Sequence, residues 1–548
     1  MADNRKVRIG ALAVAVWAAL CFLPGIGNVP LFDRDETRFG EAGREMLVRH
    51  DYLVPYFNGT PRLHKPIAFY YLLAAAYKSF GVNEFAARLP SALAGMGTCV
   101  LVFYLARRMF SLWPAALAGV VTATNLQHMV IARAATVDSV QLLLVMVCFI
   151  QLWRLYTGER QWDAYLLLYG GIALGTLTKG PVVLGVVLLA VAVITAMDRS
   201  WAMLRRLHLV PGLLASMAPV ALWFFLANHR TGGLLVTELL GHQMLGPAVG
   251  EAFEGHGGPF IYYLALLPVS FFPWTAVLPF SVWRLWKAPE ARHTRTFLVA
   301  WAVAPFLMFS FLKTKLPHYT LPGYPALAIM VGFALEQAIR QKEAILGHWT
   351  GKLGFGLFAF VALAVAGAFC VYPFATEFGH YAPEFLAVAA LMMAMVAFAL
   401  IDLLRRRNAL LALDLSLGAT IVVLTVWVAV LSACGAELPA GRMRAGFADV
   451  LRADDRVLSL RYNEPSVVFY AGRDVKFVRS WQDVADEVST TRKFICLAES
   501  RRLADMPAEL QRELEVVKAV SAFQLSTRQW VGFSFLRPRE GPNPPNGG

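Results

Sequence analysis

Charged side chains stand at the ends of apolar segments in this sequence, where they are unusual. Asp138 heads the apolar run 137–156, and Lys179 follows the run 163–178. A charge at such a position is costly and by default indicates a functional site. The polar stretch 27–83 also contains a cluster of charged residues that includes Asp33, Arg34, Asp35 and Glu36.

These residue types suit group transfer at a membrane surface. A carboxylate orients or deprotonates an acceptor hydroxyl, and lysine or arginine stabilises the charge that develops on a departing phosphate. Nucleotide-sugars and ATP are not generally available outside the inner membrane. A transferase facing outward therefore needs a donor delivered in the bilayer, such as a polyprenyl-phosphate sugar, and no nucleotide. No second carboxylate is needed to protonate the leaving group, unlike in glycoside hydrolysis.

Each of these residues also has a structural interpretation. Arg38, Glu41, Arg44 and Glu45 have helical i,i+3 and i,i+4 spacing and are open to simple pairing. Lys179, Lys313 and Lys315 have the positions of interfacial anchors that extend toward water. His242 and His256 are single histidines, which are more often structural.

The composition identifies a membrane protein. Of the 548 residues, 57% are hydrophobic and only 16% are charged, against about 25% charged in an average soluble domain. The net charge of +13 is typical of lysine and arginine in cytoplasmic loops, so no nucleic-acid partner is expected. The six cysteines form no CxxC pair and are expected to be inert.

Hydropathy and length predict about thirteen membrane spans. They lie near 9–26, 84–106, 113–132, 137–156, 163–178, 180–197, 209–227, 260–283, 296–312, 318–337, 354–375, 383–403 and 409–433. With a cytoplasmic N-terminus, lysine and arginine concentrate in the inside loops, as the positive-inside rule requires. This holds only if Ile67–Phe80 lies along the outer interface instead of spanning. The unusual polar residues then fall on the outer side.

The predicted organisation has three parts. Residues 1–435 form a transmembrane domain with long outer loops at 27–83 and 228–259. Residues 436–537 form a small α/β domain, placed outside by the odd number of spans. Its predicted strands are Arg456–Leu460, Ser466–Tyr470, Val475–Val478 and Phe494–Leu497, and its predicted helix is Trp481–Val488. The tail 538–548 is rich in Pro, Gly and Asn and is predicted to be disordered.

Several motifs resemble those of the GT-C membrane glycosyltransferases related to protein O-mannosyltransferases, and especially the bacterial 4-amino-4-deoxy-L-arabinose transferases of lipid A (ArnT). The resemblance covers nearly the whole chain. The matching stretches are Asp35–Glu41 with Arg44–Leu47, Asp51–Pro55, Asn58-Gly59, Lys65-Pro66, Glu84–Pro90, Leu177–Pro181, Pro259-Phe260 with Tyr262-Tyr263, Pro273-Trp274, Lys315–Pro322 and Glu464–Tyr470.

The resemblance implies a role for individual residues. The two characteristic outer aspartates correspond to Asp35 and Asp138, and the lysine that contacts the donor phosphate corresponds to Lys65. The tyrosine of the Lys-Leu-Pro-x-Tyr motif corresponds to Tyr319. Arg38, Lys179 and Lys313 complete the expected substrate-binding set.

The resemblance also bears on a metal site. The resembling transferases usually have Glu-Lys-Pro where this chain has His64-Lys65-Pro66, and that glutamate has been linked to metal coordination. His64, with His256 as its partner, remains a candidate pair of ligands for a divalent ion such as zinc.

The sequence thus predicts a multi-pass protein of a bacterial inner membrane with its active site facing the periplasm. The resemblance implies a monomer that acts on lipid substrates, in an inverting transfer of a sugar from undecaprenyl phosphate to lipid A, with 4-amino-4-deoxy-L-arabinose as the expected sugar. Such a reaction modifies lipopolysaccharide and is associated with polymyxin resistance. Alternatives are another sugar, such as mannose or galacturonic acid, another acceptor, such as a protein, the lipopolysaccharide core or a wall glycan, a transporter, or a non-catalytic scaffold.

Overall fold

The computed structural model describes residues 2–239, 257–524 and 527–539, and contacts divide the chain into two units. The helical unit comprises Met1–Ile26, Leu63–Leu72 and Arg88–Val426. The α/β unit comprises Gly27–Arg62, Leu73–Ala87 and Trp427–Gly548. The boundary expected at residue 435 stays a prediction.

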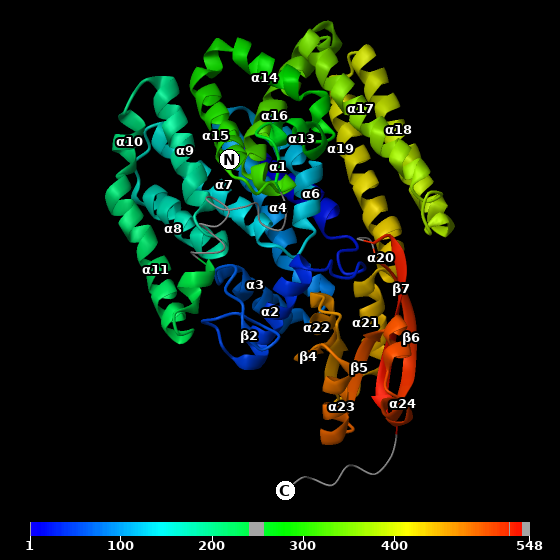
Figure 1. Ribbon diagram of the computed structural model, residues 1–548. Helices are drawn as coiled ribbons and strands as arrows, with labels where there is room; N and C mark the ends of the chain where they lie inside the picture. The colour runs from blue at the N-terminus through cyan, green and yellow to red at the C-terminus, as the bar shows by residue number, and fades with distance from the viewer. Residues whose placement is uncertain (1, 240–256, 525–526, 540–548) are drawn as a thin grey trace. The chain divides into compact units, whose positions relative to one another are not determined.

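The helical unit is built from apolar helices of unequal length (Figure 1). Among them, α17, α18 and α19 follow one another and pack side by side. Helices α3 and α4 belong partly to this unit and partly to the α/β unit. The principal helices are α1 (Ala2–Phe22), α3 (Ala68–Phe80), α4 (Glu84–Met109), α5 (Leu112–Ala123), α6 (Leu126–Ala132), α7 (Val137–Tyr156), α8 (Trp162–Lys179), α9 (Val182–Asp198), α10 (Ala202–Leu207), α11 (Leu209–Arg230), α13 (Tyr262–Ser270), α14 (Leu278–Lys287), α15 (Arg292–Phe311), α16 (Tyr324–Gln341), α17 (Trp349–Val371), α18 (Ala382–Leu404) and α19 (Asn408–Thr425).

Seven helical segments of the described chain are long and apolar enough to cross a membrane. An eighth is added if α5 and α6, which bend by 62° at their junction, form one span. A multi-pass membrane protein is therefore confirmed. The count of about thirteen spans stays a prediction, because several of the expected spans correspond to shorter or broken helices.

The expected span 260–283 is not one continuous helix. Helix α13 ends at Ser270, the 3-10 turn Trp274–Ala276 follows Pro273, and α14 begins at Leu278. Proline has no backbone N–H to donate, so it interrupts a helix that hydropathy alone reads as continuous. The helix expected at Ile67–Phe80 is present as α3.

Two buried arginines hold the end of α1. Arg133 donates from Nη1 to the carbonyl of Cys21 at 2.8 Å and from Nη2 to that of Pro24. Arg88 donates to the carbonyl of Ile26 at 2.7 Å. Both side chains are fully buried. Cys21 lies in the last turn of α1, whose carbonyls have no partner within the helix, and Pro24 and Ile26 belong to the segment that follows.

Replacing Arg133 with alanine is expected to destabilise the protein by roughly 1 to 3 kcal/mol, because the buried carbonyl of Cys21 and the partly exposed carbonyl of Pro24 lose their donor. Thermal unfolding of the detergent-solubilised protein measures the change. Arg160→Ala, at an exposed loop position, is the matched control. Equal unfolding temperatures for the two variants would show that Arg133 does not hold α1.

The α/β unit contains a five-stranded sheet of order β4-β3-β5-β7-β6. Strands β3, β4 and β5 are parallel, and β7 pairs antiparallel with both β5 and β6. Its elements are α2 (Asp35–Arg49), β1 (Tyr56–Phe57), β2 (Thr60–Pro61), α20 (Ser432–Glu437), α21 (Pro439–Val450), β3 (Arg456–Leu460), α22 (Pro465–Ala471), β4 (Val475–Val478), α23 (Trp481–Thr490), β5 (Phe494–Glu499), α24 (Ala508–Glu513), β6 (Leu514–Gln524) and β7 (Gln529–Pro538).

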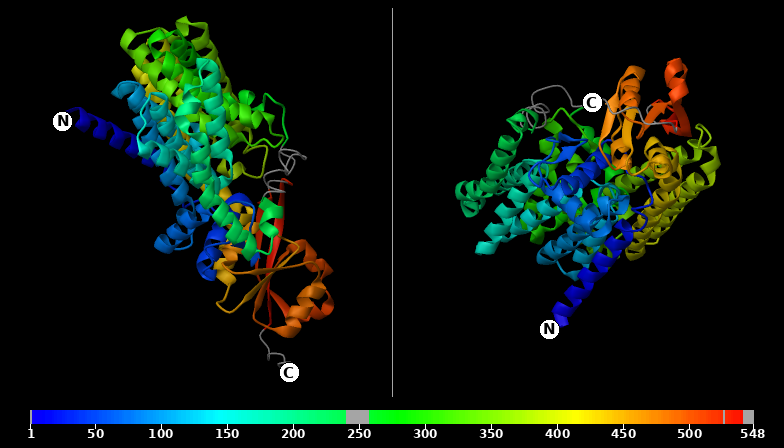
Figure 2. Two further views of the ribbon diagram at one scale, coloured as in Figure 1. Left: turned by 90° about the vertical axis from the view of Figure 1, so that its left-hand side faces the viewer. Right: turned by 90° about the horizontal axis from the view of Figure 1, so that it is seen from below.

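Helices cover both faces of this sheet (Figure 2). Val457, Ile495 and Leu497 join the core formed with α21 and α22, whereas Leu458 and Cys496 join that formed with α23 and α24. Side chains alternate between the faces along each strand, so both faces are apolar, as expected for parallel strands covered by helices.

The strand predictions are confirmed at Arg456–Leu460, Val475–Val478 and Phe494–Leu497, and so is the helix near Trp481–Val488. The strand predicted at Ser466–Tyr470 is wrong, because this segment is helix α22. Pro465 occupies the first helical turn and Gly472 ends the helix in the left-handed conformation. This arrangement of Pro and Gly outweighs the β-propensity of Val467 and Val468.

The Asn58-Gly59 pair shapes the hairpin of β1 and β2. Both residues have positive φ, 52° and 77°, as a two-residue type I′ turn requires. The Asn58 side chain also pairs with the edge strand β4: Nδ2 donates to the carbonyl of Val475 at 2.9 Å, and Oδ1 accepts from its N–H at 2.7 Å. The hairpin is thereby attached to the sheet.

Replacing Asn58 with alanine is expected to destabilise the α/β unit by roughly 1 to 3 kcal/mol, because both hydrogen bonds are lost. Limited proteolysis of the 50–62 segment measures the loosening. Gln482→Ala is the control, since that side chain bonds only Asp486 of its own helix. Unchanged cleavage would contradict the attachment.

Candidate active site

Asp138 lies at the centre of a polar cluster in the helical unit. Lys179 Nζ forms an ion pair with Asp138 Oδ1, and His318 Nε2 lies 3.4 Å from the same oxygen. The Asp138 and Lys179 side chains are each 12% exposed. One carboxylate thus meets two potential cations in a largely buried position.

The ends of two helices place this pair. Asp138 belongs to the first turn of α7 and Lys179 to the last turn of α8. Negative charge is favoured at a helix N-terminus and positive charge at a C-terminus. Helix α8 ends because Gly180 adopts φ 78° and Pro181 follows it. The helix dipoles and the ion pair therefore stabilise the same arrangement.

Tyr319 completes the cluster. The Lys179 ammonium lies 4.9 Å from the centroid of the Tyr319 ring, a cation–π distance. The ring also packs on Phe309, with centroids 4.8 Å apart. His318 and Tyr319 both come from the 3-10 turn η5 (Pro317–Gly323). The Lys315–Pro322 motif therefore contributes two side chains to one site.

A small cavity beside the cluster is lined by Asp138, Gln141, Lys179, His318 and Tyr319. Gln141 is 3% exposed, and its amide nitrogen has no acceptor within the described part of the chain. A buried donor without a partner is costly. The sequence analysis gave Gln141 no role, and it left His318 of the Lys315–Pro322 motif out of the expected site. The available signals were a polar residue three positions after Asp138 and the histidine inside the Lys-Leu-Pro-His-Tyr run.

Lys65 belongs to the same electrostatic environment. Its ammonium interacts electrostatically with the Asp138 carboxylate, and its side chain is half-buried. The predicted residues Asp138, Lys65, Lys179 and Tyr319 are thus brought together in the helical unit. Their functional roles stay predictions.

The other loop lysines differ from each other. Lys315 is buried and donates to the carbonyls of Phe309, Ser310 and Leu312, the last two at 2.9 and 2.8 Å. It thereby caps the C-terminus of α15. Lys313 is exposed and has no hydrogen bond or ion pair to the described residues.

Asp35 belongs to the α/β unit, at the first residue of α2. Arg34 just before it has φ 73° and ψ −73°, and the Asp35 N–H donates to the carbonyl of Asp33 at 3.2 Å. This is a γ-turn with positive φ, which is rare and strained. Such strain often accompanies functional positions.

The neighbouring acids have structural partners. Asp33 Oδ1 accepts from the Ser466 N–H at 2.9 Å, and Glu36 Oε2 accepts from the Phe32 N–H at 2.9 Å. Asp35 is exposed, and its carboxylate has no hydrogen bond to the described residues. Of the three acids, it is the one available to a substrate.

Helix α2 also contains the pairs expected from its spacing. Glu41 and Arg44 form a bidentate ion pair, with distances of 2.9 and 2.7 Å, and Glu45 pairs with Arg49 at 2.7 Å. Burial raises the pKa of Glu41 to about 7, against the opposing effect of Arg44. Arg38 takes no part in these pairs. Glu41, Arg44 and Glu45 are therefore structural.

A metal site is not apparent in the described part of the chain. It contains no cluster of three or more histidine, cysteine, aspartate or glutamate side chains suited to a metal ion. His64 is exposed, and His256 lies outside the described residues, as do His242, Glu251 and Glu254. The predicted pair His64 and His256 is therefore not tested, and metal binding stays a prediction.

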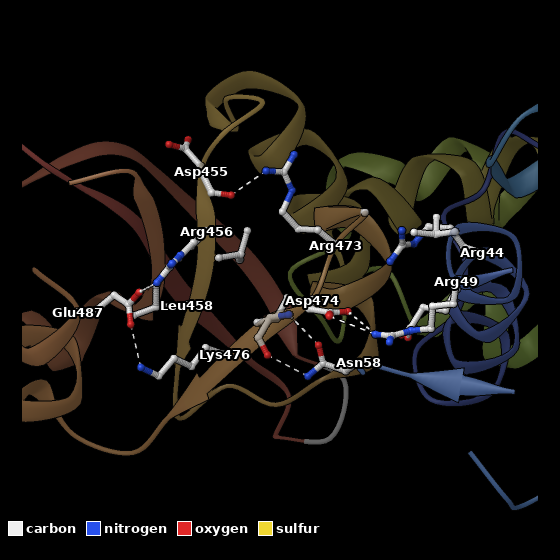
Figure 3. A pocket seen from close by; sticks show the side chains of 15 residues that line it. Arg44, Arg49, Asn58, Asp455, Arg456, Leu458, Arg473, Asp474, Lys476 and Glu487 are labelled. Atoms are coloured by element: carbon white, nitrogen blue, oxygen red, sulfur yellow. Dashed lines mark hydrogen bonds and ion pairs between the residues drawn. The ribbon is translucent and has the colours of Figure 1, made fainter. Parts of the chain in front are cut away.

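A separate charged cleft of about 780 Å³ lies between α2 and strands β3 and β4 (Figure 3). Its charges largely compensate each other. Arg49 pairs with Asp474 at 3.2 Å, and Glu487 pairs with Arg456 at 2.9 Å and Lys476 at 2.8 Å. Most of its cations are therefore already matched.

Comparisons with known proteins agree with this architecture. A family model described as dolichyl-phosphate-mannose-protein mannosyltransferase matches residues 64–223. The crystal structure of ArnT from Cupriavidus metallidurans bound to undecaprenyl phosphate superimposes with a TM-score of 0.77, at 21% identity, over 96% of this chain and 97% of that one. Its apo structure gives 0.74 at 22% identity, over 98% of each chain. The chain therefore has the GT-C fold.

Proteins with similar sequences include aminoarabinose transferases. The undecaprenyl phosphate-alpha-4-amino-4-deoxy-L-arabinose arabinosyl transferases of Edwardsiella ictaluri and Yersinia enterocolitica are each 30% identical over 367 residues. The match covers 65% of this chain and 65% of each relative's length. The chain thus spans slightly less than two thirds of these relatives' length, and over that part it is similar to them in sequence.

Proposed function

We propose that this chain is an inverting glycosyltransferase that moves 4-amino-4-deoxy-L-arabinose from undecaprenyl phosphate to lipid A. It acts as a monomer at the periplasmic face of a bacterial inner membrane. The names of the relatives support the donor, and so does the undecaprenyl phosphate bound to the similar ArnT structure. The observation that carries the proposal is the Asp138–Lys179–His318 cluster with Lys65 beside it.

The chemistry requires one nucleophile and one leaving group. An acceptor oxygen attacks the anomeric carbon of the sugar, and the bond from that carbon to the phosphate oxygen breaks. Undecaprenyl phosphate leaves with the electron pair. Lys65 stabilises the charge that develops on it, with Lys313 and Arg38 as further cations.

The two aspartates have different roles in this proposal. Asp35 orients the acceptor group and takes its proton where that group is a hydroxyl. Asp138 positions Lys179 and His318 and offsets their charge. Lys179 therefore acts with Asp138 and Tyr319, and Lys65 is the main cation for the phosphate.

Mass spectrometry of lipid A tests the function. Cells that express the chain are compared with cells that lack it and with cells that express Asp35→Asn. We expect an added mass equal to one aminopentose only with the unaltered chain. Unchanged lipid A in cells that make the donor would contradict this acceptor and donor pair.

A second candidate is transfer of another polyprenyl-phosphate sugar to a protein, the lipopolysaccharide core or a wall glycan. The matching family model names a mannosyltransferase that acts on protein, and His64 replaces the glutamate usual in the aminoarabinose enzymes. Incubating membranes with labelled lipid donors and each acceptor distinguishes these reactions. Label in protein instead of lipid A would favour the second candidate.

A zinc ion held by His64 and His256 is a separate proposal. Elemental analysis of the purified protein and of His64→Ala tests it, and activity need not be measured. Zinc near one equivalent that falls in the variant would support it, and zinc absent from both proteins would exclude it.

A further inference from the structure

An apolar groove of about 430 Å³ lies between α8 and α11 of the helical unit (Figure 1). Its walls include Leu166 and Gly170 of α8 and Ala215 and Pro219 of α11. Leu166 is 59% exposed, and Ala215 and Pro219 are exposed as well. Helix α11 is long and apolar enough to cross a membrane. In a membrane the groove therefore opens toward hydrocarbon and suits an alkyl chain.

Two tyrosines of α8 fix the start of α11 beside this groove. The Tyr165 hydroxyl donates to the carbonyl of Arg206 at 2.9 Å. The Tyr169 hydroxyl donates to the carbonyl of Leu207 at 2.7 Å. The Tyr169 ring also packs so closely on Gly212 that a Cβ added there would lie 1.9 Å from a ring atom. The groove is therefore part of the packed helical unit.

One end of the groove is polar and basic. His208 lines it, is exposed, and has its ring 5.7 Å from that of Tyr165 between centroids. The segment 199–208 contains three arginines and no acid, and none of the three forms an ion pair with the described residues. Of these arginines, Arg205 is exposed. An imidazole and a guanidinium are therefore available at this end.

The acids nearest in sequence to this basic end have other partners. Asp198 accepts from the Tyr156 hydroxyl at 2.8 Å. Asp163 pairs with Arg154 at 2.8 Å, and Glu159 pairs with the same guanidinium at 3.0 Å. The positive charge of the segment 199–208 is thus left for an anion from outside the chain.

Two exposed tryptophans mark the level of this end in the membrane. Trp162, at the start of α8, is 75% exposed, and Trp201, just before α10, is 66% exposed. Tryptophan is enriched where lipid headgroups meet water, and basic loops are enriched on the cytoplasmic side. The basic end of the groove therefore lies where the headgroups of the predicted cytoplasmic leaflet are expected.

We propose that this groove binds one anionic glycerophospholipid, such as phosphatidylglycerol. An acyl chain lies between α8 and α11, and the phosphate lies beside His208 and Arg205. Basic pockets between membrane helices on the cytoplasmic side bind anionic headgroups in this manner. The inference goes beyond the proposed sugar transfer and does not rest on it.

The position on α8 separates this lipid from the sugar donor. Tyr165 lies near the start of α8, and Lys179, which belongs to the Asp138 cluster, is its last residue. At about 1.5 Å per residue, the two are roughly 20 Å apart along the helix. A phosphate beside His208 is therefore not the phosphate that Lys65 and the Asp138 cluster would hold.

Lipids that co-purify with the full-length protein test the proposal. The protein is reconstituted in nanodiscs of phosphatidylcholine and phosphatidylglycerol in equal amounts and extracted again in detergent. Mass spectrometry then quantifies the retained lipids. Arg205→Gln/His208→Gln removes the polar end of the site. Gly170→Leu fills the groove, because a Cβ at Gly170 meets no atom within 4 Å.

Each variant has a matched control on helices that lie on the other side of the helical unit (Figure 1). Arg406→Gln changes an exposed arginine between α18 and α19 that also has no ion pair to the described residues. Gly367→Leu changes an exposed glycine of α17, where a Cβ likewise meets nothing within 4 Å. Unfolding temperatures, measured for every variant, report whether it is folded.

We expect the unaltered protein and both controls to retain phosphatidylglycerol in preference to phosphatidylcholine. In Arg205→Gln/His208→Gln this preference should fall roughly 5-fold, about the contribution of one basic residue beside an anionic headgroup. Gly170→Leu should lose most of the retained phosphatidylglycerol, because leucine occupies the space of the acyl chain.

Three results would overturn the proposal. The first is an unchanged preference in Arg205→Gln/His208→Gln, and the second is full retention of phosphatidylglycerol by Gly170→Leu. The third is displacement of phosphatidylglycerol by undecaprenyl phosphate added to the nanodiscs, which would assign the groove to a polyprenyl lipid. None of these measurements requires sugar transfer, so the outcome is independent of the proposed function.

Discussion

Replacing Asp138 with asparagine is expected to lower the rate of sugar transfer by roughly 10²- to 10³-fold, the size of effect seen when one preorganised electrostatic group is removed. Asparagine keeps the shape but loses the charge that holds Lys179 and His318. Initial rates with labelled donor, measured at saturating donor, report the change. Asp163→Asn is the matched control, because Asp163 also lies in the first turn of an apolar helix but pairs with Arg154.

A double-mutant cycle separates a local role from a general loss of folding. Lys179→Met alone should also be severe, and the double variant should be little worse than Asp138→Asn, because residues that act as a unit are not additive. Additive losses would mean that the two residues act independently. Full activity of Asp138→Asn would exclude the cluster from the reaction.

Replacing Asp35 with asparagine is expected to reduce transfer by roughly 10²- to 10⁴-fold, the usual contribution of a general base. The residue is exposed at the start of α2 and has no hydrogen bond from its carboxylate to the described residues, so stability should change little. Transfer and unfolding temperature are measured on the same preparation. Donor binding should be retained, since the proposed role concerns the acceptor.

Asp474→Asn is the control for this variant, because Asp474 is a largely exposed carboxylate of the same unit that pairs with Arg49. It should transfer at the normal rate. Full activity of the Asp35→Asn protein would show that a residue other than Asp35 orients the acceptor group. An Asp35→Asn protein that unfolds early would show that the strained turn at Arg34 depends on the aspartate.

Local patterns in the sequence determined much of the architecture. Hydropathy identified a multi-pass membrane protein, because apolar stretches of this length have no other stable environment. Alternating and continuous apolar runs located strands β3, β4 and β5. Asn58-Gly59 and the i,i+3 and i,i+4 spacing on α2 also act over short distances, so the hairpin and the Glu41–Arg44 pair follow from neighbouring residues.

Other features depended on residues distant in sequence. The strand predicted at Ser466–Tyr470 is helix α22, because its terminal Pro and Gly and its packing on the sheet outweigh the propensity of two valines. Sequence spacing did not indicate that Lys179 and His318 converge on Asp138, since they come from three separate elements. The burial of Gln141 likewise arises only when these segments pack together. The residue types therefore determined which chemistry is available, and tertiary packing decided which of those residues meet.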